Sequence, residues 1–269
     1  MNSNPLQQYF RQPGLYIDLP SRAEFYPEGT IERTENNRYP VFPMTTADEV
    51  SFNMPAGSSD GSFLVSLIQS CLPNIKDAWK MPGIDLDKVL LAIKIATYGN
   101  VTELDGQCPN CNHRQSISVD LQSCINQIKA PDFKIPIEYS DLKIFLKPMN
   151  FREISNNNQL QYEEQLVLDS LQSDDINDQE KLTRVTQVLE KINSAVISAL
   201  SSNISYIKTP KDVVSEPAHI IEWLRNCDRN NFDLIKNQII AVKTQSEIKP
   251  VTVKCSNCGT DYQQPISLN

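Results

Sequence analysis

Four of the seven cysteines form two Cys-x-x-Cys pairs, the spacing that lets two thiolates bind one zinc ion. The first pair is Cys108 with Cys111, and the second is Cys255 with Cys258. Residues 108–111 are named the first knuckle and residues 255–258 the second knuckle. We expect all four thiolates to bind a single Zn²⁺. Such an ion would connect the middle of the chain to its last segment.

Both knuckles have the character of a turn between two short strands. The flanking segments alternate β-branched or aromatic residues with polar ones, at Ile117, Val119, Val251, Val253 and Tyr262. Residues suited to a tight turn lie at Asn110, Asn112, Asn257 and Gly259. In such a turn, backbone N–H groups point at the thiolate sulfurs. Two such hairpins facing each other would make a zinc ribbon.

The cysteine set favours a structural metal over a catalytic one. A catalytic zinc keeps an open coordination position and usually has histidine or carboxylate ligands, whereas four cysteines close the shell. The knuckles are farther apart than the ~15–20 residues of a compact four-cysteine site, so an unmetallated turn or a redox Cys-x-x-Cys stays open. Neither knuckle opens a helix, which argues against the thioredoxin type.

Few other residues could carry chemistry. His113 could replace a thiolate, but with four cysteines available we expect it outside the coordination shell, and we expect His219 to be exposed or partly packed. Cys71, Cys124 and Cys227 lie among apolar residues, which favours packed thiols. No phosphate loop, His-Glu-x-x-His motif or nucleophile elbow occurs. We therefore predict no catalytic residues and no enzyme activity; a metalloenzyme would need fewer than four cysteines on the metal.

The composition also limits the partners. A net charge of -8 and a pI near 4.9 make nucleic-acid binding by the whole surface unfavourable, although Arg114, Lys249 and Lys254 could form a local basic face. No apolar run reaches the ~20 residues of a membrane span, and the N-terminal residues lack secretory-signal features. An odd number of cysteines favours metal ligands and free thiols over disulfides. We expect a protein of the cytoplasm without a membrane partner.

Three regions are predicted, in an α+β fold. Residues 1–60 form an extended, proline-rich N-terminal arm. Residues 61–121 and 250–269 form a helical base with the four-cysteine zinc ribbon. Residues 122–249 interrupt them as a β-hairpin and helical-bundle insertion.

Local patterns place the elements of the arm and the base. Pro20 and Pro27 exclude a continuous helix in the arm, where a short strand is expected around Val41 and a brief helix after it. Apolar residues at helical spacing predict one helix over residues 63–71 and a second over residues 85–98. Asp85 is the expected N-cap of the second helix, and Gly99 its stop.

The insertion begins with a strand pattern and continues with helical ones. Alternating apolar residues predict two strands, over 133–137 and 142–146, joined by a turn at 139–141. Helices follow from about residue 151, over residues 182–199, from Pro217 and over residues 232–239, with an acidic break at 173–178.

Several short motifs in order resemble the baseplate hub and hub-assembly proteins of T-even-type bacteriophages. They are Leu-Pro-Ser-Arg-Ala-Glu-Phe-Tyr-Pro-Glu-Gly (19–29), Pro-Met-Thr-Thr-Ala-Asp-Glu (43–49), Ala-Ile-Lys-Ile-Ala-Thr-Tyr-Gly (92–99), the first knuckle and Val-Asp-Leu (119–121). The resemblance covers roughly residues 15–150 and the second knuckle, and it does not extend to residues 155–247.

This resemblance implies a non-catalytic structural or assembly component of a contractile tail's central hub. Its partners would be other tail baseplate hub proteins, and homo-oligomers remain open. It would lie in the host cytoplasm during assembly, and it would either act only there or remain in the virion tail baseplate. The alternative is a zinc-ribbon accessory factor that binds nucleic acid or RNA polymerase, because ribbons are common in such factors and a fold does not fix a function.

Overall fold

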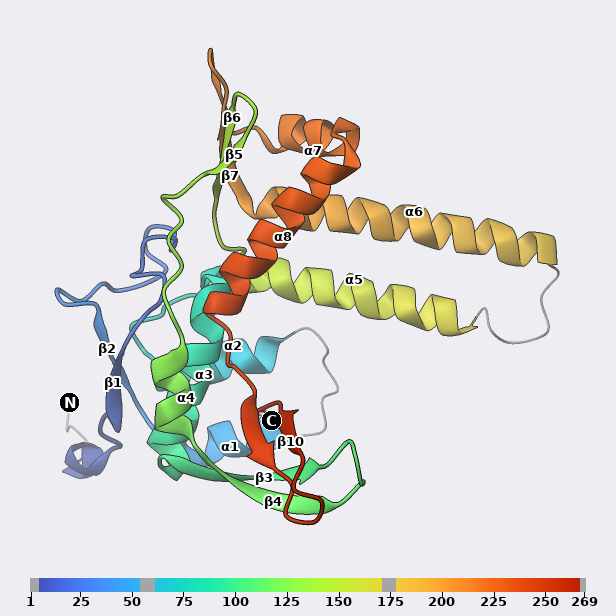
Figure 1. The fold of residues 1–269 in the computed structure, drawn as a ribbon. Coiled ribbons are helices and arrows are strands. Elements are labelled where there is room, and N and C mark those ends of the chain that lie inside the picture. Colours follow the sequence, from blue (N-terminus) through green and yellow to red (C-terminus); the bar gives the residue numbers. More distant parts are fainter. Residues whose placement is uncertain (1–4, 54–60, 171–177, 267–269) are drawn as a thin grey trace. The chain divides into compact units, whose positions relative to one another are not determined.

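The computed structural model describes residues 5–53, 61–170 and 178–266, and its mixture of helices and strands confirms the α+β class (Figure 1). The chain divides into two compact units. Unit 1 comprises Met1–Pro55, Ser62–Pro131 and Gln245–Asn269, and unit 2 comprises Ala56–Gly61 and Asp132–Thr244. None of the described helices is long and apolar enough to span a membrane.

The N-terminal part of unit 1 holds one 3-10 helix, two strands and one α-helix: η1 (Pro5–Tyr9), β1 (Leu15–Asp18), β2 (Arg38–Val41) and α1 (Thr46–Asn53). β1 and β2 form an antiparallel pair in which Leu15 lies opposite Val41. The predicted strand near Val41 and the short helix after it are confirmed. Leu19 and Tyr39 are each 1% exposed, so this stretch packs within unit 1.

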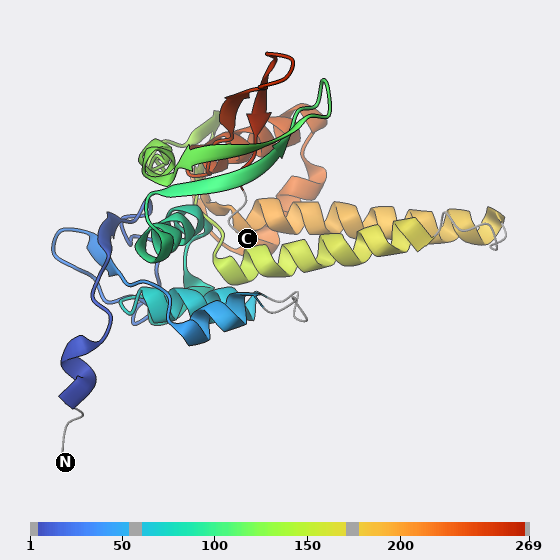
Figure 2. The same ribbon diagram turned by 90° about the horizontal axis from the view of Figure 1, so that it is seen from below.

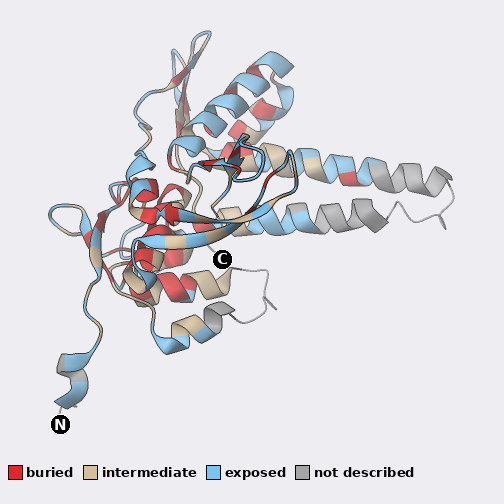
Figure 3. Ribbon diagram, turned by 60° about the horizontal axis from the view of Figure 1, so that its bottom comes forward, coloured by how far each residue is buried: buried red, intermediate tan, exposed pale blue. Residues whose placement is uncertain are grey.

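The helices of unit 1 follow: α2 (Ser62–Cys71), η2 (Ala78–Lys80), α3 (Gly83–Tyr98) and α4 (Leu121–Gln127). α2 buries the predicted apolar positions Leu67, Ile68 and Cys71. Gly99 ends α3 as predicted, because its φ of 90° is unfavourable for other residues and its N–H donates to the carbonyl of Ile95. Figure 3 shows buried residues in the helices of this unit and also in its strands and loops, among them Leu19, Tyr39 and Val41.

Asp85 does not cap α3, contrary to the prediction. α3 begins earlier, at Gly83, and the Asp85 side chain in its first turn is completely buried. Its two carboxylate oxygens accept hydrogen bonds from the N–H (2.8 Å) and the hydroxyl (2.6 Å) of Ser21. The residues after Ser21, Arg22 and Ala23, have φ values of 52° and 59°, in the left-handed region. The carboxylate thus holds a strained loop instead of capping its own helix.

Two antiparallel hairpins flank the knuckles: β3 (Val101–Gln107) with β4 (Arg114–Asp120), and β9 (Val251–Lys254) with β10 (Asp261–Gln264). Each strand of the hairpin β3–β4 buries one residue, Gly106 on β3 and Val119 on β4. These two residues lie near opposite ends of the hairpin. Where the chain leaves unit 1 and returns to it, the N–H of Lys129 donates to the carbonyl of Gln245 at 2.9 Å. The segment that contains Asp132–Thr244 therefore leaves unit 1 and returns to it at neighbouring points.

Unit 2 contains a four-stranded antiparallel sheet of β5 (Ile137–Tyr139), β6 (Leu142–Leu146), β7 (Ile204–Lys208) and β8 (Val213–Val214), in that order. The predicted hairpin is β5–β6, but its first strand starts at Ile137 instead of residue 133. Pro136 cannot donate a ladder hydrogen bond, and Ile135 is 68% exposed. β7 and β8 were not predicted.

Four helices complete unit 2: α5 (Phe151–Ser170), α6 (Asp178–Ser202), α7 (Pro217–Asn226) and α8 (Arg229–Gln245), whose last residue lies in unit 1. They confirm the predicted helices, with Pro217 in the first turn of α7. The acidic break lies, apart from residue 178, outside the described residues. α5 and α6 run side by side (Figure 2). One face of the sheet packs on α6, α7 and α8 through Ile144, Ile207, Leu200, Ile220 and Ile235.

Candidate metal centre

The two knuckles have the same backbone structure. In the first, the N–H of Asn112 donates to the carbonyl of Cys108, and the N–H of Cys108 donates to the carbonyl of His113, both at 2.9 Å. The second knuckle repeats both bonds at the same length through Gly259, Cys255 and Thr260. Asn112 and Gly259 have φ values of 56° and 72°. The turn therefore needs a left-handed residue four positions after its first cysteine, and asparagine and glycine tolerate that conformation best.

The structure brings all four cysteines of the two knuckles together. Their Sγ atoms lie within 4.8 Å of one another. Across the hairpins, Cys108 is 3.7 Å from Cys258 and Cys111 is 3.6 Å from Cys255. A tetrahedral ion with metal–sulfur bonds of about 2.3 Å has sulfur–sulfur edges of about 3.8 Å. All seven cysteines are free of disulfides. The donor set and its size thus fit one tetrahedral metal ion.

Burial differs around the cluster. Cys108 and Cys255, the first cysteine of each knuckle, are 0% and 2% exposed, Cys111 is partly exposed, and Cys258 is exposed. Val253 packs against the buried pair, together with Tyr262, Ile117 and Val251. The first cysteines therefore belong to a small core, and the second cysteines face its rim.

The same asymmetry appears in the acidity of the thiols. Burial raises the pKa of the Cys108 thiol to about 11. The Thr260 hydroxyl and backbone, followed by the Asn110 amide, lower the pKa of the Cys258 thiol to about 5. The backbone N–H of Cys258 lowers the pKa of Cys255. Hydrogen bonds to sulfur thus favour thiolates in the second knuckle, the form that binds metal.

One asparagine of each knuckle contacts sulfur on the opposite knuckle. Nδ2 of Asn110 is 3.7 Å from the Cys258 Sγ, and Nδ2 of Asn257 is 3.7 Å from the Cys111 Sγ. The two contacts are equivalent under exchange of the knuckles. Asn110 and Asn257, predicted only as turn residues, are also partners of the sulfur cluster.

Gln115 joins the two hairpins, and no sequence pattern marks it. Its Oε1 accepts from the N–H (2.8 Å) and the hydroxyl (2.9 Å) of Ser256 in the second knuckle. Its Nε2 donates to the carbonyl of Lys254 at 3.2 Å. The Gln115 side chain of β4 therefore accepts from a backbone N–H and donates to a backbone carbonyl at the second knuckle.

Gly106 allows the second hairpin to approach β3. A Cβ atom at this position would lie 2.3 Å from Cδ1 of Ile117 and 3.0 Å from the hydroxyl of Tyr262. Real Cβ atoms essentially never come as close as the first distance. A larger residue here would force the tip of the Ile117 side chain to move and would lie in tight contact with the Tyr262 hydroxyl of β10.

The other candidate residues lie outside the cluster. Nε2 of His113 is 3.1 Å from the Ser256 hydroxyl, beside the cysteines, and His219 is exposed on α7. Cys71 and Cys124 are buried as predicted, and Cys227 is only partly buried, with its thiol 3.3 Å from the carbonyl of Leu224. Burial raises the pKa of all three thiols, which makes them weak nucleophiles.

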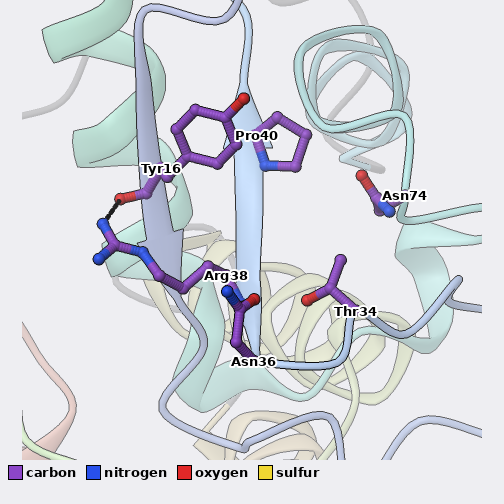
Figure 4. Close-up of a pocket in the computed structure, with 6 residues that line it drawn as sticks. All are labelled: Tyr16, Thr34, Asn36, Arg38, Pro40 and Asn74. Atoms are coloured by element: carbon purple, nitrogen blue, oxygen red, sulfur yellow. Dashed lines mark hydrogen bonds between the residues drawn. The ribbon is translucent and has the colours of Figure 1, made fainter.

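A separate shallow hollow of about 550 Å³ lies beside β2, and Figure 4 shows the residues that line it. Its lining consists of Tyr16, Thr34, Asn36, Arg38, Pro40 and Asn74. Arg38, the charged member, donates to the carbonyl of Tyr16 at 3.3 Å. The lining contains no cysteine, histidine or carboxylate, so these residues do not form a second metal or acid–base site.

The fold and the cluster define an α+β protein with a four-thiol site that can hold one metal ion. The family follows from comparison with known families, in which residues 32–268 match the family described as T4 bacteriophage base plate protein. The chain belongs to this family. No curated protein and no solved structure matches it.

Membership of this family confirms the resemblance to T-even-type baseplate proteins. It indicates a structural component of the phage tail baseplate that associates with other tail proteins, and it agrees with a role other than catalysis.

Proposed function

We propose that the chain builds the central hub of the baseplate, as a resident subunit or an assembly protein, with a structural Zn²⁺ on Cys108, Cys111, Cys255 and Cys258. The observation that carries the zinc assignment is the set of four Sγ atoms within 4.8 Å, contributed by knuckles far apart in the chain. Bound Zn²⁺ would cross-link the hairpins β3–β4 and β9–β10. The resulting domain holds surfaces in place for partners and carries out no reaction.

Zinc is preferred over other metals because four thiolates in tetrahedral arrangement suit Zn²⁺ or an iron–sulfur centre, and a closed four-thiolate shell serves a structural role. Metal analysis of the purified protein tests this, with about one zinc per chain expected. Cys258→Ser should lower the zinc content, whereas Cys227→Ser, outside the cluster, should not. Equal zinc content in both variants, or iron instead of zinc, would contradict the assignment.

The hub role is tested in infected cells. An affinity-tagged chain should recover tail hub proteins, and mass spectrometry of purified virions should show whether the chain remains in the particle. Recovery of RNA polymerase or nucleic acid in place of tail proteins would favour the accessory-factor alternative. Salt-sensitive gel-shift binding to DNA or RNA would point the same way.

A further inference from the structure

The sheet of unit 2 has an outer face, turned away from α6, α7 and α8 (Figure 1). Successive residues of a strand point to opposite faces, so the neighbours of buried Ile144 and Ile207 lie on this outer face. The outer-face set is Glu138, Lys143, Phe145, Tyr206, Lys208 and Val213.

Two lysines lie directly opposite each other on this face. Lys143 of β6 is the register partner of Lys208 of β7. Like charges at such a position destabilise a sheet. Glu138 is 3.2 Å from Lys143, but both side chains are more than half exposed, so this ion pair compensates little. Among the described residues, Lys208 has no ion-pair partner. The face keeps positive charge on a chain whose net charge is -8.

Apolar surface lies beside the two lysines. The rings of Phe145 and Tyr206 stack with centroids 4.5 Å apart and planes 18° from parallel, and both residues are partly exposed. Val213 of β8, opposite Lys208, is 60% exposed. β8 ends the sheet, so its outer edge pairs with no other described strand.

We propose that this outer face binds an extended acidic segment of a partner protein. Carboxylates of the segment would neutralise Lys143 and Lys208, and an apolar side chain would cover the Phe145–Tyr206 pair. A nucleic acid fits less well, because the two rings stack on each other instead of on bases and the net negative charge repels phosphates. Only the identification of the partner as a baseplate protein rests on the proposed function.

The experiment uses the full chain as purified and a fluorescein-labelled peptide of alternating Glu and Phe, and it measures binding by fluorescence anisotropy. The wild type should bind this peptide in a salt-dependent manner and should not bind the analogue with Gln in place of Glu. Lys208→Gln should weaken binding at least tenfold, whereas Lys236→Gln, an exposed lysine on α8, should bind like the wild type.

A second measurement separates lost binding from misfolding. Because Lys208→Gln removes a like-charge contact, it should raise the melting temperature by about 1 °C or more while it lowers affinity. The inference is overturned if the peptide does not bind, if Lys208→Gln binds it like the wild type or melts lower, or if labelled oligothymidine binds more tightly than the peptide. Zinc content and recovery of hub proteins do not depend on this peptide assay, so either proposal can fail alone.

Discussion

Asn110 and Asn257 occupy equivalent positions in the two knuckles, and each directs its amide at a cysteine of the other knuckle, over 3.7 Å. Each asparagine therefore donates a hydrogen bond to a sulfur atom of the opposite knuckle. The two hairpins act as one unit around the sulfurs.

Removal of these amides should weaken metal binding. We expect Asn110→Ala or Asn257→Ala to lower zinc affinity about 10-fold or more, the effect typical of groups that hydrogen-bond to metal ligands. Competition with a chromophoric chelator measures the affinity. Asn237→Ala, an exposed asparagine on α8, is the control. Unchanged affinity in both knuckle variants would mean that the contacts do not support the metal.

Gly106→Ala should destabilise unit 1 by about 1–3 kcal/mol, because the added methyl group displaces the tip of the Ile117 side chain and lies only 3.0 Å from the Tyr262 hydroxyl. Chemical denaturation gives the free energy of unfolding. Ser118→Ala, at an exposed position of β4, should change it by less than about 0.5 kcal/mol. If the two substitutions changed the free energy of unfolding equally, the structure around Gly106 would accommodate a methyl group without loss of stability.

Metal removal should loosen the hairpins of unit 1 first. With excess chelator, amides of β9 and β10 should exchange hydrogen faster, because two four-residue strands have little stability alone. Amides of β6 and β7 should keep their protection, since their core lies in unit 2. Hydrogen exchange with mass spectrometry resolves both regions, and equal loss in the two would contradict a local role for the metal.

Asp85 should make stability depend on pH. Burial raises the pKa of its carboxyl from 3.8 to about 6, so the stability it contributes is complete below pH 3.8 and is lost as pH rises through about 6. The loss amounts to about 3 kcal/mol. Asp85→Asn should remove this dependence, so the difference in unfolding free energy between wild type and variant should change between pH 4 and 7. A constant difference would show that Asp85 titrates as in the unfolded chain.

The sequence predicted features that depend on local spacing. The four cysteines, the face of α2 and the β5–β6 hairpin follow from periodicity or motif spacing. Asp85 was misassigned because a carboxylate in a first helical turn resembles a cap, and its partner Ser21 is distant in the chain. β7 was missed because its five residues directly follow the long helix α6. So short an apolar segment does not distinguish a strand from a continuation of the helix.

Gln115 and Gly106 could not have been found from spacing. Both matter through contacts with the second hairpin, which joins them only after the chain has passed through unit 2. A glutamine and a glycine on a strand carry no signal of such a contact. Only the three-dimensional structure shows the role of these two residues.

The hydrogen bond between Lys129 and Gln245 has a consequence for engineering the chain. A segment whose two ends lie side by side on the rest of the protein can be lengthened, exchanged or deleted without a change in the path of the remaining chain. The segment between these residues is therefore the part of the chain that can be shortened or replaced by design while the scaffold that carries the sulfur cluster is kept.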